Sequence, residues 1–164
     1  MRFGLRDKSA SKLLQMYENT RGQGFGAEAK RRIILGTYSL SSGYYDAYYL
    51  RAMKVRTKIK EDFDKAFSQV DVIISPTSPT GAFRFGDRSS DPLMMYLSDV
   101  YTISANLAGI PAISLPAGFA EPVDKKLPLG IQFLGRPFEE GVLYQIAHKF
   151  EQATDFHRKL GNAS

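Results

Sequence analysis

A long amphipathic stretch that leads directly into a β-branched segment is the feature that most limits the folds open to this chain. Residues 44–69 repeat apolar side chains at spacings of three or four, as one face of a helix does: Ala52, Val55, Ile59, Phe63, Ala66 and Phe67. Residues 70–75, VDVIIS, follow at once, and Pro76 stops them. Such a run predicts a strand that is buried on both faces and has parallel or mixed neighbours.

Shorter patterns complete an α/β layer architecture. Helices are expected at residues 12–19 with Ser9 as the cap, from residue 27 to about residue 40, from Asp91 and Pro92 towards Gly109, and at residues 139–154. Glycines at 22, 24 and 26 are expected to break the first helix, and Ile33, Ile34 and Tyr38 to form a buried stripe on the second. Residues 112–115 and 129–134 predict a hairpin. The result is a mixed β-sheet flanked by helices and incomplete in this chain.

Composition limits the class of protein. The 164 residues are 43% hydrophobic and 24% charged, which suits one globular domain or part of a larger one. A net charge of +5 is too moderate to indicate nucleic acid by itself. The chain has no Cys, which excludes disulfides and favours the cytoplasm. We expect a soluble protein with no membrane partner, because no segment approaches the roughly 20 apolar residues of a spanning helix.

Self-contained catalytic chemistry is not evident in the sequence. His148 and His157 are the only histidines, and their spacing matches no metal motif, so no metal site is predicted. We interpret His148 as an ordinary helix residue rather than a general base. The glycine-rich residues 22–26 lack the preceding strand of a dinucleotide-binding loop.

Several blocks of sequence nevertheless form an ordered series. The first blocks are Gly24-Phe25-Gly26, Lys30-Arg31-Arg32-Ile33, Leu35-Gly36-Thr37-Tyr38 and Gly43-Tyr44-Tyr45-Asp46-Ala47-Tyr48-Tyr49. Later blocks are Asp91-Pro92-Leu93 with Tyr96 and Asp99, Asn106-Leu107-Ala108-Gly109, Pro111-Ala112, and Gly130-Ile131-Gln132 before Gly135. In order and spacing they resemble the C-terminal part of the amidase signature family, and residues 31–56 resemble its tRNA-dependent amidotransferase branch.

The resemblance implies both a domain and a reaction. Residues 1–164 would be the C-terminal portion of a single amidase domain whose N-terminal catalytic part is absent. In the A subunit of such an enzyme, a serine attacks the side-chain amide of glutamine and ammonia is released. The B subunit then uses ATP, Mg²⁺ and this ammonia to convert Glu-tRNA(Gln) to Gln-tRNA(Gln), and a C subunit braces the two. The implied partners are therefore glutamine, the B and C subunits, and tRNA mainly through the B subunit, with no cofactor in this chain.

The family's catalytic serines and lysine are not expected in this chain. In the family, glycines flank both sides of a serine pair and let the backbone approach the substrate. Here Leu40 and Tyr44 flank Ser41, Ser42 and Gly43. We interpret the trio as a polar break between two helices, assign no catalytic residue, and expect the isolated chain to be inactive.

Arg32 and Asp99 match the family's glutamine-binding positions. Free glutamine carries an α-carboxylate and an α-ammonium, which call for a cation and an anion at fixed separation. Arg32 would grip the carboxylate with two parallel hydrogen bonds, and Asp99 would accept from the ammonium. Spacing alone offers an alternative, in which Arg32 pairs with Glu28 one helical turn away and Asp99 is a solvated helix residue.

The sequence allows alternative interpretations of two surfaces and two alternative functions for the chain. The tyrosines at 44, 45, 48 and 49 cover too much of a helix for one core stripe, so at least half are expected in the core and the others against missing sequence or a partner subunit. The basic residues between 51 and 60 are interpreted as a solvated face, with attraction of tRNA as the alternative. The chain could instead belong to an amidase that acts on small amides, or be a non-catalytic module that binds tRNA or a partner.

Overall fold

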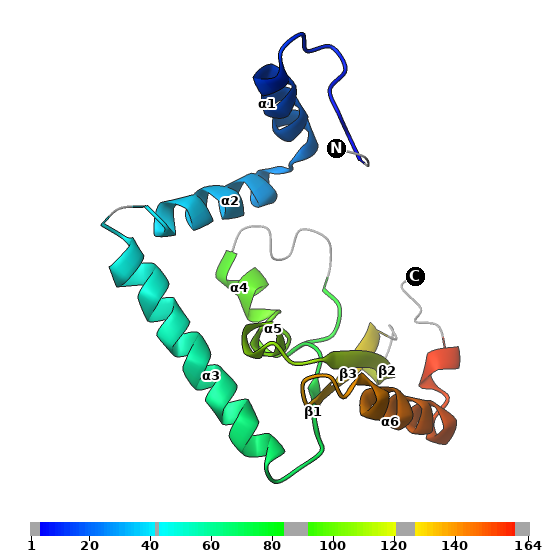
Figure 1. Ribbon diagram of the computed structural model, residues 1–164. Helices are drawn as coiled ribbons and strands as arrows, with labels where there is room; N and C mark the ends of the chain where they lie inside the picture. Colours follow the sequence, from blue (N-terminus) through cyan, green and yellow to red (C-terminus); the bar gives the residue numbers. More distant parts are fainter. Residues whose placement is uncertain (1–3, 42, 84–91, 121–126, 160–164) are drawn as a thin grey trace. The chain divides into compact units, whose positions relative to one another are not determined.

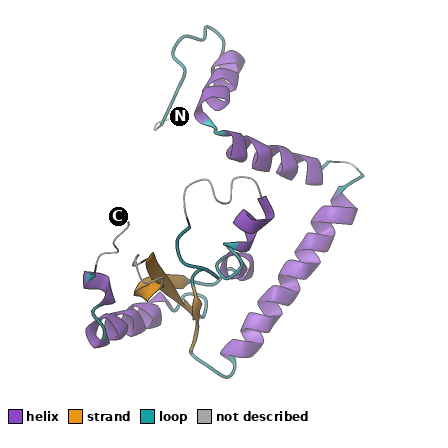
Figure 2. Cartoon of the chain, turned by 180° about the vertical axis from the view of Figure 1, so that it is seen from behind, coloured by secondary structure: helices purple, strands orange, loops and turns teal. Residues whose placement is uncertain are grey.

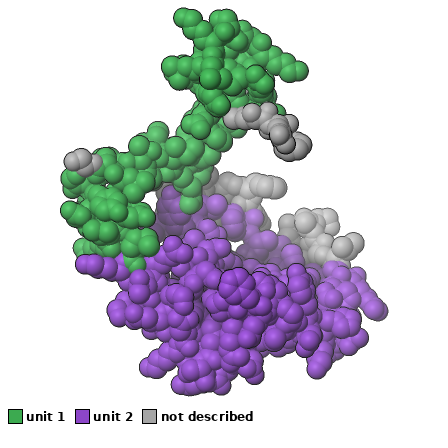
Figure 3. Space-filling model, in the orientation of Figure 1, with its two compact units in different colours: residues 1–53 green, residues 54–164 purple. Residues whose placement is uncertain are grey.

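The computed structural model describes residues 4–41, 43–83, 92–120 and 127–159 (Figure 1). The chain divides into two compact units, residues 1–53 and residues 54–164, which Figure 3 distinguishes by colour. The assignment of residues 1–164 to a single amidase domain stays a prediction.

The first unit is helical. It holds α1 (Leu13–Gly24), α2 (Ala27–Ser39), a π-helical turn η1 (Tyr45–Leu50) and the start of α3 (Arg51–Phe67). The long helix expected at residues 44–69 is thus present, with η1 as its first turns.

The segment before α1 folds back onto that helix. The Asp7 carboxylate accepts hydrogen bonds from the Asn19 amide at 2.6 Å and from the backbone N–H and hydroxyl of Ser9 at 2.9 and 2.7 Å. The Asp7 N–H donates to the buried Thr20 hydroxyl at 3.0 Å. The predicted Ser9 cap is therefore wrong, because Ser9 is engaged with Asp7 and α1 begins at Leu13 without a side-chain cap.

The glycines at 22, 24 and 26 end the first helix as predicted, but later than expected, since α1 continues past Gly22 to Gly24. A glycine inside a helix lowers its stability by only about 1 kcal/mol, which good helix formers nearby can offset. Moreover, the Gly22 carbonyl accepts a hydrogen bond from the Lys30 ammonium at 2.7 Å, which satisfies an acceptor in the last turn. The helix ends after Gly24, at Phe25, whose backbone is extended.

The α2 helix has no buried residue. Ile33 and Ile34 are 51% and 67% exposed, so the predicted buried stripe is wrong for the chain as described. The tyrosines that follow are likewise outside a core. Tyr44 lies 4.3 Å from Tyr38 between ring centroids, but three of the four tyrosines in and beside η1 are exposed and Tyr49 is half-buried, which contradicts core packing for at least half of them.

The second unit is built on a three-stranded sheet with the order β1-β3-β2 (Figure 2). Its strands are β1 (Val72–Pro76), β2 (Ala112–Ala120) and β3 (Leu127–Gly135), and both pairings are antiparallel. The predicted hairpin is confirmed as β2 and β3. The expectation of parallel neighbours and two buried faces for β1 is wrong among the described strands, because β1 is an edge strand and Ile74 is 55% exposed.

Helices pack on both faces of this sheet, which confirms the α/β class. On one face, Leu134 joins a buried cluster with Phe67 at the end of α3 and with Ala105, Ala108 and Ile110 in and after α5 (Ile103–Ala108). On the other face, Phe133 meets Phe150 of α6 (Glu140–Ala153) at 5.8 Å between ring centroids. Figure 1 shows α6 alongside β2 and β3.

The apolar pattern after residue 91 forms two short helices instead of one. These are α4 (Pro92–Leu97) and α5, separated by a turn at residues 98–102. Asp91, the expected cap, lies outside the described residues. Gly109 ends α5 as expected, with a left-handed φ of 72° that suits glycine.

A 3₁₀ turn, η2 (Phe156–Arg158), follows α6. Over the described part of the chain, none of the helices has both the length and the apolar character needed to cross a membrane. The cytoplasmic location stays a prediction.

Candidate functional site

Arg32 lies on the exposed surface of α2 and shares one acid with its neighbour Arg31. The Arg32 Nε lies 3.0 Å from one oxygen of Glu28, and the Arg31 Nη1 lies 2.5 Å from the other. Side-chain exposure is 63% for Arg32, 58% for Arg31 and 49% for Glu28. The helical Arg32–Glu28 pair expected from spacing is therefore present. Ion pairs this exposed contribute only about 0–1 kcal/mol each.

Asp99 lies in the turn between α4 and α5 rather than within a helix. Its backbone is fixed, because its N–H donates to the Tyr96 carbonyl at 3.2 Å and its carbonyl accepts from the N–H groups of Thr102 and Ile103 at 3.0 and 2.9 Å. Its side chain is exposed, and the carboxylate makes no hydrogen bond or ion pair with the residues that the structure describes. Asp99 thus presents an anion on an ordered backbone.

A buried amide links this turn to the sheet. Gln132 in β3 is 2% exposed and donates to the Tyr101 carbonyl at 2.8 Å and to the Ser75 hydroxyl at 2.9 Å. Sequence reasoning placed Gln132 in a family block but gave it no role. The available signal was its position as the one polar side chain in residues 127–135, LPLGIQFLG.

Arg32 belongs to the first unit and Asp99 to the second. Each is placed within its own unit, and their action on one ligand stays a prediction. The Ser41 hydroxyl donates to the Tyr38 carbonyl at 2.6 Å, as in a polar helix ending. Ser42 lies outside the described residues.

The basic face of α3 is largely engaged within the chain. Arg56 donates to the Leu107 carbonyl at 2.8 Å, which ties α3 to α5. Lys58 pairs with Glu61 at 2.6 Å, and Glu61 raises the pKa of Lys58 first by a hydrogen bond and then by its charge. Lys60 pairs with Asp64 at 2.6 Å. These contacts favour the solvated-face interpretation over a tRNA surface.

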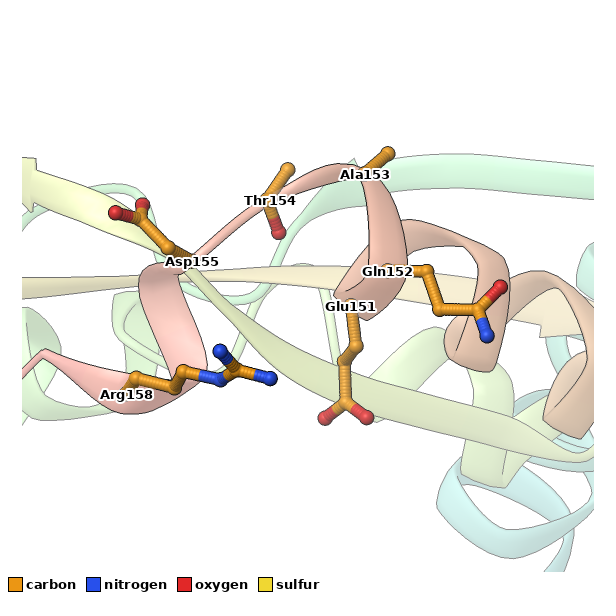
Figure 4. Close-up of a pocket in the computed structure, with 6 residues that line it drawn as sticks. All are labelled: Glu151, Gln152, Ala153, Thr154, Asp155 and Arg158. Carbon is orange, nitrogen blue, oxygen red and sulfur yellow. The ribbon is translucent and has the colours of Figure 1, made fainter.

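Neither Arg32 nor Asp99 lines either of two pockets formed by the described residues. An open pocket of about 670 Å³ at the end of α6 is lined by Glu151, Gln152, Ala153, Thr154, Asp155 and Arg158. Figure 4 shows the Arg158 guanidinium and the Glu151 carboxylate extending to the same side of this turn. An apolar pocket of about 480 Å³ lies between α1 and α2, with Phe25, Ile33 and Ile34 in its lining. Within the described residues, His, Asp and Glu form no group that could hold a metal ion.

His148 is an exposed residue of α6, as expected. Its Nε2 lies 3.0 Å from the Gln152 amide nitrogen, one helical turn further on. This local contact gives it no orientation towards a substrate.

Comparison with known proteins defines the class. The sequence pattern of the Amidase family matches residues 1–143, which is most of the chain. The chain belongs to this family.

Curated proteins similar to this chain belong to one branch of the family. The chain is 60% identical over 160 residues to the A subunit of glutamyl-tRNA(Gln) amidotransferase from Heliobacterium modesticaldum, and 58% identical over 158 residues to that of Carboxydothermus hydrogenoformans. These matches cover 98% and 96% of the chain but only 32% of each relative. They confirm the resemblance seen in the sequence.

Solved structures agree with this placement. The structure of the glutamyl-tRNA(Gln) amidotransferase A subunit from Thermotoga maritima matches 78% of the chain and 27% of that protein, with a TM-score of 0.54 and 49% identity. The structure of 6-aminohexanoate cyclic dimer hydrolase matches 88% of the chain and 32% of that protein, with a TM-score of 0.62. At 19% identity, the second match supports the fold alone.

Proposed function

We propose that this chain is part of the glutamine-hydrolysing A subunit of a tRNA-dependent amidotransferase and that it supplies glutamine-binding groups. The identity of 58–60% to such A subunits over nearly the whole chain carries the proposal. The ammonia released from glutamine would convert Glu-tRNA(Gln) to Gln-tRNA(Gln) on a B subunit that uses ATP and Mg²⁺, with a C subunit bracing the complex.

Arg32 would bind the α-carboxylate of glutamine. Glu28, which pairs with Arg32, also pairs with Arg31, so Glu28 keeps a cation when Arg32 turns to the ligand. The guanidinium can exchange a weak exposed pair for a bidentate contact in a desolvated site. The ion pair with Glu28 is therefore compatible with a role of Arg32 in binding the ligand.

Asp99 would accept hydrogen bonds from the α-ammonium. An exposed carboxylate on a backbone held by three hydrogen bonds suits that task. The backbone is already ordered, so binding the ligand does not have to order it. The amide bond itself would be broken by a serine in the part of the amidase domain that this chain does not contain. We therefore propose that the isolated chain does not hydrolyse glutamine.

A chimeric enzyme tests the binding roles. This chain replaces the matching segment of the Heliobacterium modesticaldum protein, and glutamine hydrolysis is measured after assembly with B and C subunits. Removing one partner of a desolvated charge pair loses about 2–5 kcal/mol of binding, so Arg32→Ala and Asp99→Asn should each raise the KM for glutamine about 30-fold or more.

Arg31→Ala is the matched control. Arg31 lies in the same helical turn, contacts the same Glu28 and has similar exposure, so its loss should raise KM by no more than about fivefold, which is the equivalent of one exposed ion pair with Glu28. Equal effects of Arg31→Ala and Arg32→Ala would contradict the assignment. Unchanged glutamine hydrolysis in Arg32→Ala would favour an amidase for small amides. Salt-dependent tRNA binding without any glutamine effect would favour a non-catalytic module.

A further inference from the structure

The Gln132 side chain makes two hydrogen bonds, one to a neighbouring strand and one to a turn. It lies in the central strand β3 between apolar neighbours, where an unbonded amide would be strongly unfavourable. One bond goes to Ser75, its register partner in β1, which the backbone ladder already holds. The other goes to the Tyr101 carbonyl, 31 positions away in a turn that belongs to no strand.

The Tyr101 carbonyl is only two residues beyond Asp99. The Asp99 carbonyl accepts the N–H of Thr102 and Ile103, so residues 99–103 form one hydrogen-bonded unit. A displacement of the Tyr101 carbonyl therefore carries the Asp99 backbone, and its carboxylate, with it.

Other contacts tie α5 to the rest of the unit, and local hydrogen bonds tie the turn to α5: the Tyr101 carbonyl also accepts from the Ser104 hydroxyl at 3.3 Å, and the Thr102 carbonyl accepts from the Asn106 amide at 3.3 Å. Ala105 and Ala108 are buried in the cluster around Leu134, and Arg56 binds the Leu107 carbonyl. With these contacts intact, loss of the Gln132 bond frees the Tyr101 carbonyl from the sheet while α5 stays packed, so the turn can shift relative to β3.

We propose that Gln132 is a positioning residue that sets the Asp99 carboxylate against the α-ammonium of glutamine. This inference rests on the proposed function. It assigns to the buried amide a contribution to substrate selection in addition to its structural hydrogen bonds.

The assembled chimeric enzyme provides the test. Gln132→Met keeps the length of the side chain and removes both donors, whereas Ser75→Ala removes only the bond to β1. Because Asp99→Asn should raise the KM for glutamine about 30-fold or more, a displaced Asp99 carboxylate should give a similar or smaller rise, and we expect Gln132→Met to raise this KM about 10-fold with a much smaller change in kcat. Ser75→Ala should change KM less than about twofold.

Glutaramate, which is glutamine without its α-amino group, separates positioning from general loss of structure. Gln132→Met should leave glutaramate hydrolysis close to that of the unmodified enzyme. In the double variant Asp99→Asn with Gln132→Met, the KM for glutamine should rise no further than in Asp99→Asn, because both changes remove the same interaction. If Gln132→Met does not assemble, Gln132→Asn, whose amide is one methylene too short, should give the same result.

Each contrary outcome has a distinct meaning. A raised KM in Asp99→Asn with an unchanged KM in Gln132→Met overturns the positioning role alone. So does an equal loss with glutamine and with glutaramate, or an equal effect of Ser75→Ala. An unchanged KM in Asp99→Asn overturns the glutamine site and the positioning role together.

Discussion

Arg136 joins three elements of the second unit at one point, which makes it a sensitive probe of the fold. Its guanidinium donates to the Phe67 carbonyl at 2.9 and 3.3 Å and to the Val70 carbonyl at 3.1 Å. It also pairs with Asp71 at 3.1 Å and with Glu139 at 3.7 Å. The end of α3, the start of β1 and the approach to α6 therefore depend on one side chain.

The exposure of each partner sets how much the Arg136 contacts contribute to the free energy of unfolding. A hydrogen bond from a charged donor contributes about 1.5–3 kcal/mol, and the 36% exposure of Arg136 places its two carbonyl contacts together at about 2–3 kcal/mol. The pair with Asp71 adds about 0–1 kcal/mol, because Asp71 is 82% exposed. Arg136→Met should thus lower the free energy of unfolding by about 2–4 kcal/mol, and Asp71→Asn by about 1 kcal/mol or less.

Urea unfolding followed by circular dichroism measures both changes, with equal m-values required for the comparison. Arg136→Lys should recover less than half of the loss, because a single ammonium cannot reproduce the guanidinium fork across two carbonyls. If Asp71→Asn were as destabilising as Arg136→Met, the ion pair rather than the helix-end contact would be the source, and the reasoning would be refuted.

Two further predictions concern close packing and acid stability. Gly130→Ala places a Cβ 2.7 Å from the Thr77 hydroxyl and should lower the free energy of unfolding by about 1–3 kcal/mol in urea, less in a Thr77→Ala background; an unchanged midpoint would contradict this contact. Hydrogen bonds from Ser9, and then from Asn19, lower the pKa of Asp7 below its ordinary value of 3.8. Their stabilisation is complete above that value and is lost as pH falls through the lower folded pKa, so Asp7→Asn should flatten this acid slope in unfolding measurements; an unaltered slope would rule it out.

Elements whose signals are local were predicted well. The helix expected at residues 139–154 is α6, Glu140–Ala153, and the hairpin expected at residues 112–115 and 129–134 is β2 and β3. Their apolar periods coincide with the faces that pack together. The helix after residue 91 was predicted less well, because the apolar pattern continues through Val100 and Ile103 while the chain turns. That turn is bonded to Gln132, a contact 31 positions away that no local pattern contains.

The candidate site likewise has one feature that local sequence predicts and others that it does not. The Arg32–Glu28 pair follows from helical spacing, and the structure confirms it. The assignment of Arg32 and Asp99 to one ligand came from the family resemblance, since nothing in the local sequence relates positions 67 residues apart. Gln132 was present in a recognised block, but its role depends on which strand and turn meet across it, and only the tertiary structure supplies that information.

The sequence-based errors in burial have a common physical cause. Ile33 and Ile34 on α2 and Ile74 on β1 follow the patterns of buried positions, yet each is more than half exposed. An apolar stripe reflects burial in the complete fold, and a face of this kind in water is unfavourable by about 25 cal/mol per Å². The chain spans 32% of the length of its curated relatives, and we expect segments of such a protein outside this span to cover these faces. The same argument allows the proposed substrate-binding charges to lie here while the proposed nucleophile lies elsewhere, because segments that are distant in sequence can together form one core and one site.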